Sequence, residues 1–203
     1  MNKPPPEESI RHDEASKAGQ ASRAGEASSA REASKAGEPI RIELTSAKGL
    51  HQSLGEPLDL SVQIVNVSEE PVWMVGVLPG SEGLRYPQYK AEIEGPSGPV
   101  APMLAEGLDY ARGLQADDFV RLDPGESFDP QEGKRFIPIQ PLAWFRPTEP
   151  GTYRLRLRFD ATAEDPRLWM GQTPVRDRSR VERLIKQVPQ VEVCSNTLEL
   201  TCE

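Results

Sequence analysis

The chain has 203 residues, and its 32 acidic side chains outnumber its 24 basic ones, which gives a formal net charge of −8 at pH 7. Binding to a phosphate backbone needs clustered lysine and arginine, so this composition predicts no nucleic-acid partner. No run of about 18 apolar residues is present, so no membrane-spanning helix is expected. The 20 prolines and 16 glycines indicate many turns and a β-rich fold.

The first residues contain no apolar segment of the kind found in signal peptides. We therefore expect a cytoplasmic protein. A true start further upstream would instead allow a secreted or envelope-associated one.

Residues 1–38 are predicted to form a disordered tail. Within it, residues 15–38 repeat a hexapeptide four times, with the consensus AS(K/R/S)A(G/R)(Q/E). The repeat offers no side chain larger than alanine to bury against a neighbour, which argues against a solenoid. Its glycines disfavour a helix. We interpret it as a flexible linker, with a docking or tethering arm as the alternative.

From residue 39 onward, short alternations of apolar and polar residues predict β-strands, because strand side chains point to opposite faces with a period of two. The nearly continuous apolar run 71–78 predicts a central strand covered on both faces, and residues 65–71 predict a hairpin leading into it. Pro138 makes its segment an edge strand or no strand at all. The predicted strands cover residues 40–44, 58–64, 71–78, 89–94, 119–122, 135–139, 153–159, 191–193 and 197–201.

The run from Tyr153 to Phe159 alternates apolar residues with arginines, as expected for a strand that is buried on one face only. Pro150 and Gly151 just before it suit a tight turn. Tyr153 directly after this turn looks like the tyrosine corner of immunoglobulin-type sandwiches, where the hydroxyl bonds back to the backbone. The alternative is an ordinary inward-facing tyrosine.

The last segment changes parity, because its inward positions are odd up to Val193 and even from Leu198 onward. A bulge around residues 194–196 would reconcile the two patterns. Cys194 and Cys202 would lie roughly 26 Å apart along one strand, which is beyond bridging distance, so we expect two unpaired thiols unless the chain turns between them.

Two insertions, around residues 95–116 and 161–190, enlarge the domain beyond a minimal sandwich. In the second, apolar residues recur at i, i+3, i+4 and i+7 between Arg178 and Val188, which predicts a short amphipathic helix. We expect it to cap one end of the fold. The predicted fold class is an all-β, antiparallel β-sandwich of seven or eight strands over residues 39–203.

Three patches of sequence carry a family resemblance. They are G-E-P-L-D-L-S-V-Q-I-V-N-V-S-E-E-P-V (residues 55–72), L-D-P-G-E-S (122–127) and P-G-T-Y-R-L-R-L (150–157). Together they resemble bacterial immunoglobulin-like sandwich domains, and in particular the intracellular proteinase inhibitor-like group. W-M-G (169–171) and S-N-T-L-E-L (195–200) resemble the ends of such domains. The resemblance implies an immunoglobulin-like fold, whereas no residue matches an inhibitory motif.

Catalytic chemistry has little support in the sequence. Of the two histidines, His12 lies in the tail and His51 in a polar loop, so a triad with a histidine base is not expected. No zinc-ligand spacing and no phosphate-binding loop is present, and we expect no cofactor. The pairs 117–118 and 164–165 could supply calcium ligands, but solvated loop carboxylates are the preferred interpretation. The sequon at Asn66 is expected to be idle in a cytoplasmic protein.

Two sets of residues are candidate binding groups. Arg154, Arg156 and Arg158 form a stripe that could grip an acidic partner. The preferred alternative is a structural ladder in which Glu199 and Glu203 of the last strand pair with these arginines. Trp144 and Trp169 are candidates for a platform on which a sugar could stack, whereas Trp73 is expected in the core.

The sequence as a whole favours a non-catalytic module that binds another protein. The alternative is a proteinase inhibitor that presents a loop, at residues 79–87 or 95–116, to a protease. A carbohydrate-active or metal-assisted enzyme is a third, weaker reading. The oligomeric state stays open.

Overall fold

The computed structural model describes residues 37–76, 85–101, 113–130, 145–171 and 174–203. Residues 15–36 of the hexapeptide repeats, the predicted strand at 135–139 and Trp144 lie outside these described residues, as do residues 79–84 and 102–112 of the two candidate inhibitory loops.

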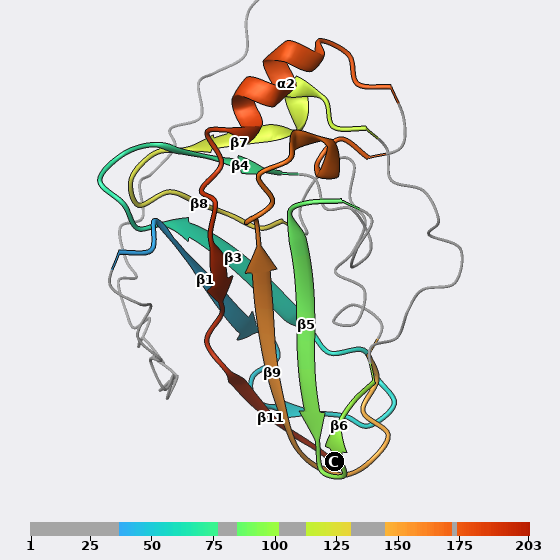
Figure 1. The fold of residues 1–203 in the computed structure, drawn as a ribbon. Coiled ribbons are helices and arrows are strands. Elements are labelled where there is room, and N and C mark those ends of the chain that lie inside the picture. The colour runs from blue at the N-terminus through green and yellow to red at the C-terminus, as the bar shows by residue number, and fades with distance from the viewer. Residues whose placement is uncertain (1–36, 77–84, 102–112, 131–144, 172–173) are drawn as a thin grey trace, which may run out of the picture.

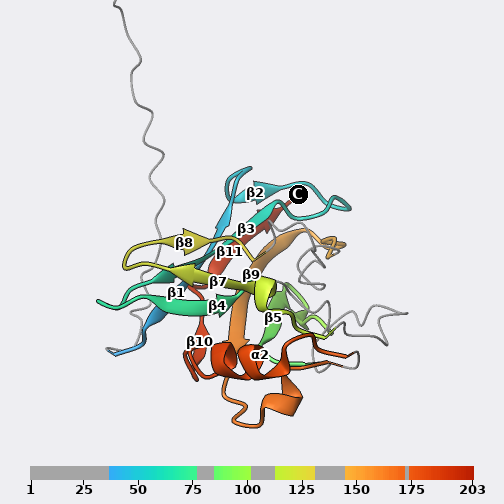
Figure 2. The ribbon, with the colours of Figure 1, turned by 90° about the horizontal axis from the view of Figure 1, so that it is seen from above.

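The strands form an all-β sandwich whose two main sheets face one another across the core (Figure 1). The first sheet has the order β1 (Ile40–Ser46), β3 (Leu60–Asn66) and β8 (Ser127–Phe128). The six-stranded sheet has the order β2 (His51–Gln52), β11 (Leu198–Cys202), β9 (Gly151–Asp160), β5 (Gln88–Gly95) and β6 (Gly98–Pro99), and β10 (Glu192–Cys194) also pairs with β9. A two-stranded ribbon, β4 (Val72–Val75) with β7 (Phe119–Leu122), lies beside the first sheet (Figure 2).

The predicted inward faces of the long strands are confirmed. On β1 the even positions are buried, and on β9 the odd positions are buried. Burial of these apolar side chains from both sheets is the main stabilising term of the fold. The core residues on these two strands are Ile40, Ile42, Leu44, Tyr153, Leu155, Leu157 and Phe159.

The strand predicted at 71–78 forms as β4 and has buried side chains on both faces, but its central position and the hairpin at 65–71 are wrong. Among the described residues β4 pairs only with β7, and β3 pairs with β1 and β8, so residues 67–71 cross from one sheet to another. The Asn66 amide holds this crossover by donating to the backbone oxygens of Glu70 (2.9 Å) and Leu122 (3.0 Å). A buried amide with two such partners specifies the connection between the sheets. The same contacts take the sequon asparagine into the interior.

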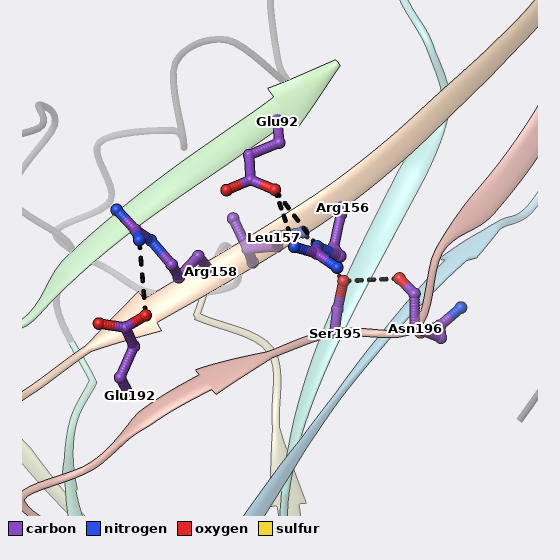
Figure 3. Close-up of polar contacts among 7 residues, drawn as sticks. All are labelled: Glu92, Arg156, Leu157, Arg158, Glu192, Ser195 and Asn196. Atoms are coloured by element: carbon purple, nitrogen blue, oxygen red, sulfur yellow. Dashed lines mark hydrogen bonds and ion pairs between the residues drawn. The ribbon is translucent and has the colours of Figure 1, made fainter. Parts of the chain in front are cut away.

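The bulge predicted at the end of the chain is confirmed. Cys194 pairs with Arg158 and Leu198 with Leu155, so residues 195–197 face only two residues of β9. The Ser195 amide donates to the Leu157 oxygen (2.8 Å), and its hydroxyl accepts from the Leu157 amide (2.9 Å), as Figure 3 shows in part. The interruption therefore leaves no ladder group of Leu157 unsatisfied.

Asn196, the next residue of the bulge, joins the two sheets. Its side-chain oxygen accepts from the Leu44 amide (2.7 Å), and its side-chain nitrogen donates to the Leu44 oxygen (2.9 Å). Because β1 is the last strand of its sheet, the amide of Asn196 takes the place of a neighbouring strand at this one position.

The hydrogen bond predicted for Tyr153 is present. Its hydroxyl donates to the backbone oxygen of Glu149 (3.0 Å), four residues upstream, and its ring packs edge-on against Phe145. Gly151 adopts φ +139, and a Cβ there would lie 2.6 Å from Pro96. The turn before β9 therefore requires glycine.

The predicted amphipathic helix forms as α2 (Arg178–Ile185) and ends before Val188, which is buried in the turn that follows. α2 lies at one end of the sandwich, over the β4–β7 ribbon (Figure 1), as expected for a cap. In the part of the chain that the structure describes, no helix has the length and apolar character needed to span a membrane.

Candidate binding surfaces

The outer face of the six-stranded sheet carries the arginine stripe of β9. Arg154 Nε lies 2.7 Å from Glu199 on β11. Arg156 Nη2 lies 3.2 Å from Glu92 on β5, and Arg158 Nη1 lies 3.4 Å from Glu192 on β10 (Figure 3). Each arginine thus has one carboxylate partner on a neighbouring strand. The ladder with Glu199 is confirmed.

The pairing predicted for Glu203 is wrong. The last register pair of β11 joins Cys202 to Gly151, so Glu203 lies past the end of β9. Its carboxylate instead lies 3.9 Å from His51 Nδ1, and both of these side chains are highly exposed. His51 belongs to the short strand β2 rather than to a loop.

Charge is unevenly distributed along this ladder. Arg154 stands between Glu94 and Glu199, and its pKa is raised by the hydrogen bond that it donates to Glu199 and by the charges of both carboxylates. Arg158, in contrast, stands directly opposite Lys90 on β5. The face is therefore acidic around Arg154 and basic at the row of Lys90 and Arg158, and the next row, in which Asp160 lies opposite Glu192, is again acidic.

The ion pair of Arg158, which with Lys90 and Arg156 forms what we call the basic end of the ladder, is longer than that of Arg154 at the acidic end. The contact from Arg158 to Glu192, at 3.4 Å, is the longest of the three, and Arg158 Nε is buried without a hydrogen-bond partner among the described residues. Two like charges directly opposite on neighbouring strands also destabilise a sheet. The side chains of Arg154, Arg156 and Arg158 nevertheless stay 58%, 39% and 33% exposed, respectively.

The two tryptophans that the structure describes, Trp73 and Trp169, do not form a surface platform, and Trp144 lies outside the described residues. Trp169 is fully buried, packs near Tyr86 and donates from Nε1 to the Ala163 oxygen (2.8 Å), so its ring cannot stack on a ligand from solvent. Trp73 packs against the core and is partly exposed.

One carboxylate of each predicted pair is engaged within the chain, whereas Asp117 and Glu164 are exposed, as expected. Asp118 was expected in solvent but is only 2% exposed, and its carboxylate accepts from the Gln115 amide (2.8 Å). Asp165 is held by Arg167, whose hydrogen bonds to its side chain lower the pKa of that carboxyl. Within the described ranges, no three potential ligand side chains gather where they could hold a metal ion.

The two cysteines are unpaired, as predicted. Cys194 is exposed on the same face as the arginines, opposite Arg158. Cys202 is buried, and burial raises the pKa of its thiol.

Sequence reasoning missed two features. The first is the pairing of Glu92 and Glu192 with the stripe, for which the only signal is their outward parity on β5 and β10. The second is the basic surface of α2. Its signal was available, because residues 176–186 contain five basic and two acidic side chains in a chain of net charge −8.

Comparison of the chain with protein-family models, with curated proteins and with solved structures gives no match in any of the three. The geometry of its surfaces is therefore the ground for assigning a function.

Proposed function

We propose that this chain is a non-catalytic protein-interaction module of immunoglobulin-like β-sandwich type, and that its docking surface is the basic end of the ladder, formed by Lys90, Arg156 and Arg158. The observation that carries the proposal is the direct opposition of Lys90 and Arg158. Like charges directly opposite one another destabilise a sheet, and among the described residues only Glu192 of β10, 3.4 Å from Arg158, pairs with the two cations. A carboxylate supplied by a partner would remove that repulsion.

The ladder also prepares these arginines for binding. A guanidinium has five N–H donors in a fixed plane. Among the described residues, the ladder engages Nε and Nη2 of Arg156 and Nη1 of Arg158, so each of these side chains keeps further N–H donors, although Nε of Arg158 is buried. Side chains already held by a neighbouring strand lose less conformational freedom when a partner binds. The alternation of both charge signs along the face favours selection among partners more than tight binding.

The charge-reversing substitution Lys90→Glu tests the proposal. It converts the like-charge opposition into an opposite-charge pair with Arg158, so the sheet should become more stable by about 0.2–1 kcal/mol. Binding to a protein partner should nevertheless weaken. A purely structural ladder predicts the same gain in stability with no change in binding.

The experiment uses the full chain with Lys48→Glu as the matched control, because Lys48 is exposed in the turn after β1 and its substitution changes the net charge equally. Proteins captured from the native lysate would be identified, purified and titrated against the three chains by calorimetry. Affinity lost with Lys90→Glu and kept with Lys48→Glu supports the proposal. A failure to capture any partner, or equal affinity for all three chains, rejects it.

The alternative of a proteinase inhibitor stays a prediction, since residues 79–84 and 102–112 of its two loops lie outside the described residues. Inhibition in a panel of purified proteases, lost when either loop is cut, would favour it over the interaction module.

A further inference from the structure

The exposed face of α2 is a second, separate basic surface. Arg180, Arg183 and Lys186 follow one another at i, i+3 and i+6, a spacing that places them as neighbours along one side of the helix. All three are exposed, and none has an ion-pair partner among the described residues. The one ion pair on this helix joins Arg178 to Glu182 (2.9 Å). We call the row of Arg180, Arg183 and Lys186 the basic ridge.

The stability of the helix explains only part of this ridge. Arg183 and Lys186 lie at the C-terminal end, where cations interact favourably with the helix dipole. Arg180 lies in the first turn, where a cation opposes the dipole, and it stands one turn from Arg183, a like charge. An unpaired row of cations on an acidic chain therefore fits a binding role better than a stabilising one.

The other side of α2 limits what the ridge can bind. Val181, Leu184 and Ile185 are buried against the core, so the helix has no free apolar face to insert into a membrane. Three cations release few counterions, and the net charge of −8 opposes a nucleic acid. A protein segment rich in carboxylates is the ligand that fits the ridge, because arginine pairs with carboxylates through two parallel hydrogen bonds.

We propose that the basic ridge of α2 is a docking site for a short acidic protein segment. The ridge spans about 9 Å along the helix axis, which is the length of about three extended residues. Two or three closely spaced carboxylates therefore suffice to cover it. The proposal does not rest on the docking surface of the sheet, which lies on other elements.

The test measures binding of the full chain to a fluorescein-labelled eight-residue peptide with glutamate at every second position. The variant Arg180→Gln/Arg183→Gln should bind about fivefold more weakly, as expected for two exposed ion pairs. The matched control Lys48→Gln/Arg146→Gln removes the same charge from exposed sites elsewhere and should bind normally. Lys90→Glu should also bind normally, which keeps a failure here distinct from a failure of the proposed function.

Further measurements test whether the ridge binds carboxylates rather than another anion and whether the variant stays folded. A peptide with glutamine in place of glutamate should not bind, and vesicles containing anionic lipid or a single-stranded oligonucleotide should bind more weakly than the acidic peptide. Urea unfolding of the ridge variant should be no easier than that of the parent chain, because the substitutions remove a repulsion. No binding of the acidic peptide, equal loss in the control variant, or tighter binding of vesicles or oligonucleotide would overturn the proposal.

Discussion

Replacement of Asn196 by alanine should remove a polar link between the two sheets. The side chain makes two hydrogen bonds to one residue, to the amide (2.7 Å) and the oxygen (2.9 Å) of Leu44. Leu44 is fully buried while Asn196 is in place, so the substitution leaves both of its backbone groups without this partner at a largely buried position. Each unsatisfied buried group costs about 1–3 kcal/mol, and partial relaxation of the bulge brings the expected total loss to about 2–4 kcal/mol.

Urea unfolding followed by tryptophan fluorescence measures this loss, since Trp169 is buried in the folded state. Thr197→Ala is the matched control, because Thr197 lies in the same bulge and no hydrogen bond of its side chain is part of the link. It should change the free energy of unfolding by less than about 0.5 kcal/mol. A loss for Asn196→Ala no larger than that of the control would refute the reasoning that this amide replaces a strand at the edge of β1.

Two core substitutions, a thiol reagent and a pH series with Cys202→Ala test the described contacts. Tyr153→Phe removes the hydroxyl bond to Glu149 but keeps the ring, so it should cost about 0.5–1.5 kcal/mol, and an unchanged urea midpoint would contradict the role of that bond. Trp169→Phe loses both volume and an indole hydrogen bond in the core and should cost about 1–3 kcal/mol, whereas a surface platform residue would leave stability unchanged. A thiol reagent should modify Cys194 at once but Cys202 only as fast as the protein unfolds, and similar rates for both would argue against the burial of Cys202. Because the folded state keeps the Cys202 proton at a pH where the unfolded chain releases it, the free energy of unfolding should also fall as pH rises above about 8.5, with a shallower slope in Cys202→Ala.

The sequence determined the local periodic features of this protein. The period of two set the buried faces of β1 and β9, and the parity change after Val193 located the bulge. The apolar spacing in α2 predicted which of its residues are buried. These features follow from the sequence because they depend on the geometry of a single strand or helix, which repeats along the chain.

Pairing between distant segments was decided only by the tertiary structure. Residues 71–78 read as a central strand, yet β4 pairs only with β7 in the described residues, because an apolar run does not specify which strand lies beside it. Trp169 is a core residue although it lies in an insertion. The alternation of side chains along β5 and β10 places Glu92 and Glu192 on the outer face, but the strand register decides that they lie within reach of Arg156 and Arg158. Bringing such distant segments together costs chain entropy, which only the packing of the whole fold offsets, so a single strand cannot specify this pairing.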